Sequence, residues 1–241
     1  WSQLRLAQGQ YPDAEILQKQ AIQKLKPEEM YRNLGYLAQI QFRSGRLNPA
    51  KKHLDEALKQ LDKLDEVARK KGRPFFDWFF SEFCYRKLVS LKSQPGRASW
   101  MASLEQMIDL YPEVVNYPHA LIYKFAGLAS LAQGDESTGL SRLSQSIQYL
   151  ETCATQPTIQ LLGVTARAVR VNYRIHRKQL DEVRNDMVHI RNVLRSRKDI
   201  GHFFQPEIDA LAPCLRSRRV AAAHLESVQQ AISRILNKIP Y

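Results

Sequence analysis

Hydrophobic residues return every three or four positions along most of this chain, with polar residues between them. In one such stretch, Val164, Ala168, Val171 and Ile175 fall on a single helical face. This spacing matches the 3.6-residue period of an α-helix, and no sustained two-residue alternation indicates a strand. The pattern predicts helices at residues 1–8, 12–25, 28–44, 47–71, 75–92, 97–110, 117–133, 136–154, 158–178, 180–198, 206–213 and 217–238.

Small residues recur within this periodicity in a shared order. The two fullest copies are residues 34–38 (LGYLA), followed by Phe42, Gly45, Ala50, Leu54 and Ala57, and residues 125–129 (FAGLA), followed by Gly134, Gly139, Leu143 and Ile147. A partial copy at the start has Gly9, Ala14 and Ala21. Small residues let two helices approach closely, and glycine can close a helix in the left-handed conformation. The order therefore predicts a repeated pair of antiparallel helices.

This pattern resembles tetratricopeptide repeats. The resemblance is best over residues 31–61 and 120–150, partial over 1–25 and weak over 168–194. The long helices expected between residues 47 and 92 are more similar to the irregular repeats of helical sensor domains in bacterial transcription activators. The resemblance implies an all-α fold, a right-handed stack of antiparallel helix pairs (a TPR-like α-solenoid). It also implies a regulatory parent protein.

Proline and glycine punctuate the helical pattern. The strongest breaks are expected at residues 71–74 and 93–96, with further breaks at 156–157 and 199–202. We expect residues 1–241 to form a single helical-repeat domain with a subdivision near residue 156. Because the chain begins at Trp1 inside a predicted helix, we interpret it as a fragment of a longer protein.

The charge of the chain indicates which kinds of partner it favours. The net charge is +12, and residues 163–241 hold 15 Lys or Arg against 7 Asp or Glu, which is +8 of that total. Excess positive charge favours acidic surfaces and nucleic acid. The three cysteines, Cys84, Cys153 and Cys214, are far apart and odd in number, which favours a reducing, cytoplasmic setting. No apolar stretch has the length of a membrane span.

The arginines of the basic half fall at helical spacing. Arg167, Arg170, Arg174 and Arg177 form the first arginine stripe, and Arg184, Arg191 and Arg195, followed by Lys198, form the second arginine stripe. Spacings of three and four residues place each stripe on one face of its helix. One interpretation is a solvated face, and the other is a surface that binds acidic groups, to which guanidinium gives planar, bidentate contacts.

An aromatic cluster lies between residues 75 and 85. Its members Phe76, Phe79, Phe80 and Phe83 share one helical face, which we expect in the core. Trp78 and Tyr85 fall partly off that face. They either fill a neighbouring groove between helices or line a concave surface that binds a peptide.

No motif predicts catalysis, a cofactor or a metal. The sequence lacks nucleophile-elbow, phosphate-loop and zinc-protease patterns, and its histidines are scattered; His176 and His189 lie on neighbouring predicted helices. We expect a non-enzymatic domain that binds an acidic protein or peptide through Arg167, Arg170, Arg174, Arg177, Arg184, Arg191, Arg195, Trp78 and Tyr85. The alternative is a nucleic-acid-binding module that uses the stripes at 167–198.

Overall fold

The chain is helical throughout the part that the structure, a computed structural model, describes. That part comprises residues 2–7, 9–91, 94–111, 116–152, 157–177, 179, 183–197, 201–215 and 224–239. Every regular element in these ranges is an α-helix or a 3-10 helix, and none is a strand, which confirms the all-α prediction. Contacts divide the chain into unit 1, residues 1–149, and unit 2, residues 150–241.

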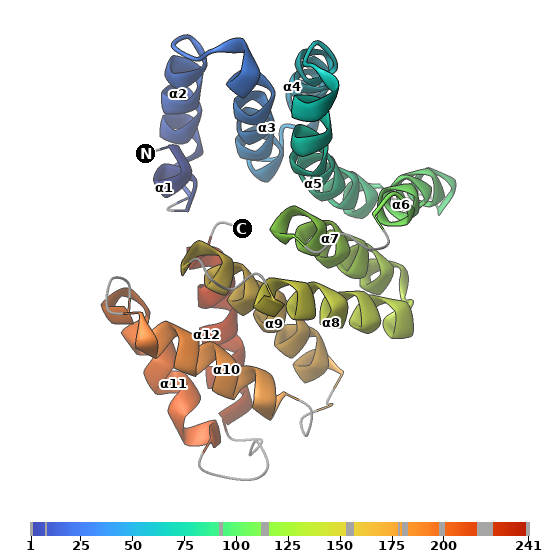
Figure 1. The fold of residues 1–241 in the computed structure, drawn as a ribbon. Helices are drawn as coiled ribbons and strands as arrows, with labels where there is room; N and C mark the ends of the chain where they lie inside the picture. The colour runs from blue at the N-terminus through green and yellow to red at the C-terminus, as the bar shows by residue number, and fades with distance from the viewer. Residues whose placement is uncertain are drawn as a thin grey trace. The chain divides into compact units, whose positions relative to one another are not determined.

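Unit 1 holds the first seven helices and most of the eighth (Figure 1). They are α1 (Ser2–Ala7), α2 (Tyr11–Ile22), α3 (Pro27–Arg43), α4 (Leu47–Asp62), α5 (Glu66–Ser90), α6 (Gln94–Asp109), α7 (Tyr117–Gln133) and α8 (Glu136–Thr152). Helix α3 packs against α2, α4 and α5, while α5 also packs against α6 and α7. Helix α5 is therefore the central element of this unit.

Unit 2 is built from the remaining helices. They are α9 (Pro157–His176), α10 (Arg184–Ser196), the 3-10 helix η2 (Gly201–Phe204), α11 (Gln205–Leu215) and α12 (Leu225–Lys238). Helix α9 packs against α10 and α12, and α11 packs against both α10 and α12. The subdivision expected near residue 156 falls in 153–156, which lie outside the described residues.

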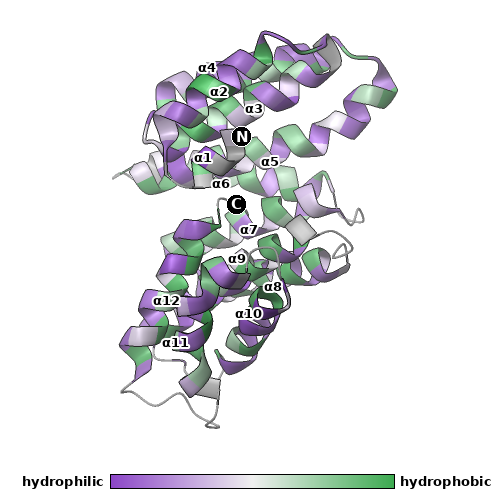
Figure 2. Cartoon of the chain, turned by 90° about the vertical axis from the view of Figure 1, so that its left-hand side faces the viewer, coloured by the Kyte–Doolittle hydropathy of each residue, from purple (hydrophilic) through white to green (hydrophobic). Residues whose placement is uncertain are grey.

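Each unit buries the apolar faces that the periodicity predicts. In unit 2, Val171, Met187, Ile190 and Ile232 belong to one buried cluster and are almost fully enclosed. The helices accordingly carry hydrophobic and hydrophilic residues side by side, as Figure 2 shows for α10 and α12. This amphipathic arrangement lets each helix cover the core with one face and meet solvent with the other.

Glycines close three of the helical segments as the sequence predicts. Gly9, Gly45 and Gly134 have φ angles of 70°, 83° and 87°, in the left-handed region. Gly45 separates α3 from α4, and Gly134 separates α7 from α8. A glycine adopts this conformation without the Cβ clash that other residues meet, so each turn can be short.

Helix α5 corrects the predicted break at residues 71–74. The helix continues through Gly72 and Pro74 and begins instead at the N-cap Asp65, whose side chain accepts a hydrogen bond from the backbone N–H of Ala68 at 2.9 Å. Gly72 marks a close approach, because a Cβ there would lie 2.6 Å from Cδ1 of Leu61. The glycine thus serves packing between α4 and α5, and the helix boundary lies at the cap.

Small residues also allow α7 and α8 to touch. A Cβ added at Gly127 would lie 2.9 Å from the carbonyl oxygen of Gly139, a backbone atom that cannot easily move away. Ala38 and Ala57, which the repeat pattern also places at contacts, are fully buried. The predicted close contact at Gly127 is therefore confirmed, and Ala38 and Ala57 are buried as a close contact requires.

Replacing Gly127 by Ala is expected to lower the free energy of unfolding by about 1–3 kcal/mol, because the methyl group overpacks the contact with α8. Gly163 of α9 is the matched control, since a Cβ there meets only the Cβ of Leu150 at 3.9 Å. Gly163→Ala should raise stability by roughly 0.5–1 kcal/mol through helix propensity. Urea unfolding followed by circular dichroism measures both changes, and a Gly127→Ala protein as stable as the parent would contradict the close contact.

Candidate functional site

Three guanidinium groups of the first arginine stripe meet at one carboxylate. Asp186, in the first turn of α10, accepts a hydrogen bond from Nη1 of Arg167 at 2.7 Å. It also accepts two bonds from Arg170, from Nε at 2.7 Å and from Nη2 at 2.6 Å. Nη1 of Arg174 lies 3.8 Å from the same carboxylate, and Arg167 contacts Glu151 as well. We call Asp186 and these three arginines the Asp186 cluster.

The Asp186 cluster corrects the expectation that the first arginine stripe is exposed. The side chains of Arg167, Arg170 and Arg174 are only 12%, 13% and 15% exposed. Asp186 is itself buried because α10 packs against α9. The arginines turn inward because a charge in a poorly solvated place needs an opposite charge nearby. Arg177 alone of the first stripe is exposed, and its Nε donates to the hydroxyl of Tyr173 at 3.3 Å.

The two histidines singled out from the sequence have different neighbours. His189 Nδ1 lies 4.0 Å from a carboxylate oxygen of Glu151, beside the Asp186 cluster. Burial and the charge of Arg167 lower the pKa of His189, against the opposing effect of Glu151. His176 instead lies 3.2 Å from Nε2 of Gln229 on α12. The arrangement thus gives each histidine a local polar contact within unit 2.

Arg184, Arg191 and Arg195 of the second arginine stripe lie on α10, whereas Lys198 lies outside the described residues. Arg195 is exposed, and Arg184 and Arg191 are half-buried. Among the described residues, no ion pair joins a carboxylate to Arg191 or Arg195, and the buried Nε of Arg191 has no hydrogen-bond partner. Two like charges four residues apart on a helix repel each other. The pair is therefore a place where an added anion would be favourable.

Trp78 is a core residue, which corrects its expected place on a peptide-binding surface. Its side chain is 2% exposed and stacks on Phe79 with ring centroids 4.6 Å apart. The ring of Tyr36 meets it edge-on at 6.3 Å, and that of Tyr117 at 6.2 Å. Tyr85 is half-buried, and burial raises the pKa of its hydroxyl. Of the two aromatic candidates, only Tyr85 reaches the surface of unit 1.

Unit 1 contains a buried charge cluster that the sequence analysis did not identify. Glu82 of α5 is fully buried and accepts hydrogen bonds from Nε and Nη2 of Arg43 at 2.7 and 2.8 Å. It also accepts from Nε2 of Gln39 at 2.8 Å and from Nη2 of Arg86 at 3.0 Å. Burial alone raises the pKa of Glu82, but the two arginines and Gln39 outweigh it and lower the pKa to about 2. We call these four residues the Glu82 cluster.

Lys124 of α7 lies near this cluster and is 3% exposed. Burial lowers the pKa of its ammonium to about 7, and Arg43 and Arg86 act in the same direction while Glu82 opposes them. No sequence signal marked Lys124, since a single lysine in a helix is ordinarily at the surface. The residue is nonetheless the most deeply buried lysine among the described residues.

A second buried polar group in unit 1 joins α5 to the end of α6. Asp77 is fully buried and accepts from Nε of Arg73 at 2.9 Å and from the hydroxyl of Tyr111 at 2.5 Å. Burial raises the pKa of Asp77 against both partners. His119 is buried with its ring 4.3 Å from that of Tyr111. The hydrogen bonds occupy both oxygens of the carboxylate, so the group contributes to the packing of α5.

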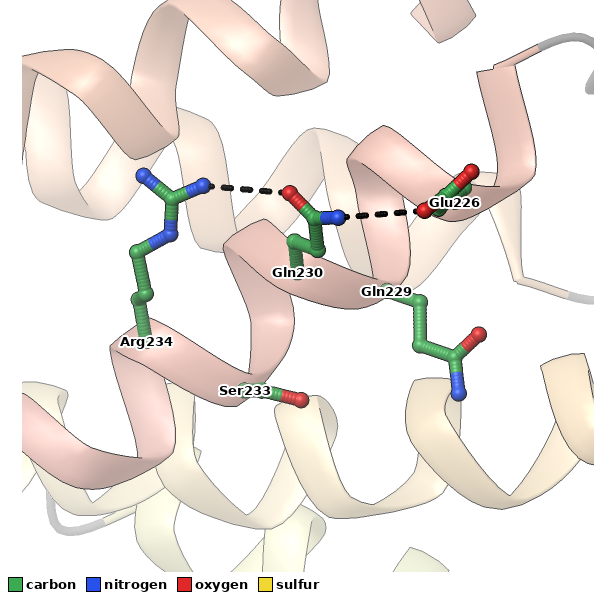
Figure 3. Close-up of a pocket in the computed structure, with 5 residues that line it drawn as sticks. All are labelled: Glu226, Gln229, Gln230, Ser233 and Arg234. Atoms are coloured by element: carbon green, nitrogen blue, oxygen red, sulfur yellow. Dashed lines mark hydrogen bonds between the residues drawn. The ribbon is translucent and has the colours of Figure 1, made fainter.

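Helix α12 borders an open surface hollow of about 520 Å³ (Figure 3). It is lined by Glu226, Gln229, Gln230, Ser233 and Arg234. Gln230 donates to Glu226 at 3.3 Å and accepts from Arg234 at 3.4 Å, so the side chains run as a ladder along the helix. Figure 3 shows Gln229 and Ser233 pointing away from this ladder. Because Glu226, Gln230 and Arg234 are hydrogen-bonded to one another, we propose no ligand for this hollow.

The described residues hold no group of three or more His, Cys, Asp or Glu side chains placed to bind a metal ion. No described helix is both long and apolar enough to cross a membrane. Cys84 is buried with a free thiol, while Cys153 and the side chain of Cys214 lie outside the described part. Comparison with protein-family models, curated proteins and solved structures finds no match to this chain.

Proposed function

We propose that this chain is a non-catalytic protein-interaction domain that binds an acidic segment of a partner protein through α10. The binding surface is formed by Arg191 and Arg195 of the second arginine stripe. This surface is smaller than the set of binding residues expected from the sequence, because Arg167, Arg170 and Arg174 are paired with the buried Asp186.

One observation carries this proposal. Arg191 and Arg195 repel each other across one helical turn, and the buried Nε of Arg191 lacks a partner. Charge-assisted hydrogen bonds from the outer guanidinium nitrogens of Arg191 and from the exposed Arg195 to a carboxylate would relieve this repulsion, whereas the Nε itself is covered by protein. Arginine also matches the planar shape of a carboxylate. An acidic side chain is therefore the ligand group that fits this surface.

The helical architecture supports an interaction role. We propose a TPR-like arrangement, a right-handed stack of antiparallel helix pairs, because Gly9, Gly45 and Gly134 turn the chain in the same way at repeated places. The close contact of Gly127 with Gly139 adds the small-residue packing such pairs need. Repeat folds of this kind bury a continuous core and present extended surfaces to partners. A regulatory protein would use such a domain to recruit a partner.

Charge reversal on α10 tests the proposal. The double variant Arg191→Glu, Arg195→Glu should weaken binding of a fluorescent peptide rich in Glu and Leu at least tenfold, and the loss should shrink as salt screens the charges. Lys59→Glu, Lys63→Glu is the matched control, because it makes the same charge change at the same spacing, at exposed positions in the last turn and at the C-cap of α4 in unit 1. Circular dichroism confirms that both variants fold.

The same assay separates the alternative, a nucleic-acid-binding module, for which the net charge of +12 is the motivation. Phosphate binding gives a logarithmic affinity that falls linearly with the logarithm of salt concentration. Tighter binding of random duplex DNA or RNA than of the peptide, lost in the α10 variant, would favour the alternative. Equal loss of peptide binding in the α4 control would overturn the assignment of the site to α10.

A further inference from the structure

The outward face of α10 carries four side chains at the spacing of a seam between two packed helices. Asn185, Val188, Asn192 and Arg195 follow one another at intervals of three, four and three residues. Val188 is half-buried and the other three are exposed, while the opposite face of α10 is buried in the core of unit 2. Intervals of three and four residues keep one row of side chains facing a second helix. We call these four residues the α10 seam.

The α10 seam encloses places into which a partner's side chain can insert. Residues at i, i+3, i+4 and i+7 of a helix surround a hole that accepts one side chain of a facing helix. One such hole is formed by positions 185, 188, 189 and 192, and the next by positions 188, 191, 192 and 195. The two holes are centred three residues apart. Apolar side chains recur at this interval on one face of an amphipathic helix, so such a helix can fill both holes.

Arg191 lies on one edge of the α10 seam and sets its preference for charge. It is half-buried with its Nε covered by protein, so its outer guanidinium nitrogens are the groups that can meet a partner. Arg195 lies one helical turn further along α10. A partner helix places two carboxylates at the same separation when its acidic residues are four positions apart. The guanidinium groups and the carboxylates therefore match in spacing as well as in charge.

The backbone of α10 disfavours an extended partner. Its N–H and C=O groups are used within the helix, so α10 offers no strand edge to which an extended peptide could add. An extended peptide would bind through side chains alone, and its own backbone groups would depend on water for hydrogen bonds. A helical segment instead pairs its backbone groups internally and can contact the α10 seam with one row of side chains.

We propose that the α10 seam docks an amphipathic helix of the partner protein, with apolar side chains in the two holes and two acidic residues, four positions apart, facing Arg191 and Arg195. This inference rests on the proposed binding of an acidic segment by α10 and adds the conformation of that segment. Neither Asn185 nor Asn192 makes a side-chain hydrogen bond to another described residue. Because a polar residue in a helical seam fixes the register of the two helices, the docked helix should place an amide or hydroxyl group opposite one of them.

Peptides of different helical propensity test the conformation of the ligand. The first is about 20 residues long, so that a helix can form, with Leu at intervals of three and four and Glu at intervals of four along one edge. The second has the same composition, shuffled so that no helical face is apolar, and the third is the first with a central Pro. Fluorescence anisotropy with the full chain should show the first binding about tenfold tighter than either other peptide. A proline inside a helix costs more than the roughly 1.4 kcal/mol to which a tenfold change corresponds.

The bound conformation can be measured directly. With the first peptide labelled with ¹³C at its Cα atoms, the resonances of its central residues should move to helical chemical shifts as the full chain is added. The shifts should not appear with the double variant Arg191→Glu, Arg195→Glu. A bound peptide with the chemical shifts of an extended chain would overturn the proposal.

A bulky neutral side chain in the α10 seam separates docking from charge attraction. Asn192→Tyr obstructs both holes without changing any charge, so it should weaken binding of the first peptide about tenfold and leave the weaker binding of the shuffled peptide unchanged. Asn237→Tyr is the matched control, because it makes the same change at an exposed position of α12. Circular dichroism confirms that both variants fold. Unchanged binding of the first peptide by Asn192→Tyr would refute docking on the seam.

The outcomes also separate this inference from the proposed function. If the first and shuffled peptides bind equally, and both are lost in Arg191→Glu, Arg195→Glu, then α10 binds acidic segments but does not select a helix. If no acidic peptide binds the parent chain, the assignment of the site to α10 fails as well. Self-association of the parent chain that Asn192→Tyr abolishes would assign the seam to a second copy. Tighter binding of duplex RNA than of the first peptide, lost in the same variant, would assign it to nucleic acid.

Discussion

Replacing Glu82 by Gln is expected to lower the free energy of unfolding by about 3–5 kcal/mol, because it removes the carboxylate of a buried ion pair and leaves the cations behind. Gln retains the shape but not the charge, so Arg43 and Arg86 would face an amide. Urea unfolding followed by tryptophan emission measures the change. Glu66→Gln is the matched control on the same helix, since Glu66 and Lys70 are both largely exposed and their pair should contribute only about 0–1 kcal/mol.

The pH dependence gives this prediction a second signature. The pKa of Glu82 is about 2 in the folded chain and 4.5 for an ordinary glutamate. A lowered folded pKa means that the carboxylate stabilises the fold above pH 4.5 and that this contribution is lost as pH falls toward 2. The difference in free energy of unfolding between the parent chain and Glu82→Gln should therefore become smaller as pH falls from 4.5 toward 2. A gap below 1 kcal/mol at pH 7 would show that the Glu82 cluster is not what holds α3 against α5.

Asp186→Asn should destabilise unit 2 as strongly as Glu82→Gln destabilises unit 1. Arg167 and Arg170 would lose their shared carboxylate, and the expected loss of stability is again about 3–5 kcal/mol. Residues 150–241 contain no tryptophan, so far-ultraviolet circular dichroism has to follow this change. Asp209→Asn is the control, because Asp209 is exposed on α11 and, among the described residues, accepts a side-chain hydrogen bond only from Gln205.

Comparison with a charge reversal on the arginines sharpens this test. Reversing Arg170 and Arg174 places two new carboxylates beside Asp186, so we expect that variant to unfold more easily as well. If Asp186→Asn and the reversal both melt like the parent chain, the first arginine stripe is a solvated surface after all. The structural role assigned to the Asp186 cluster would then be wrong.

The helices were predictable from sequence because their signals are local. The recurrence of apolar residues every three or four positions identifies a helix without knowledge of its neighbours, and the turns at Gly45 and Gly134 follow from one residue type. Gly72 shows where local reading fails. A glycine can end a helix, but it can also let a neighbouring helix pack closely. Only the position of the Leu61 side chain shows that Gly72 has the second role.

The charge clusters were not predictable for a related reason. A stripe of arginines has the same spacing whether it faces solvent or a buried carboxylate, and Asp186 lies 16 residues from Arg170. Glu82 and Arg43 are 39 residues apart on different helices. The burial of Trp78 likewise depends on Tyr36 and Tyr117, which α3 and α7 bring to α5. Each of these features is decided by packing between elements.

The burial of the Glu82 carboxylate among its hydrogen-bond donors also has an evolutionary consequence. Losing one member of the Glu82 cluster is costly, whereas replacing a whole buried ion pair by apolar residues of similar volume is often neutral or stabilising. Single changes at positions 39, 43, 82 and 86 should therefore be rare among homologous sequences. Coordinated changes should occur instead, with the acidic residue and both arginines either kept together or exchanged together for hydrophobic side chains.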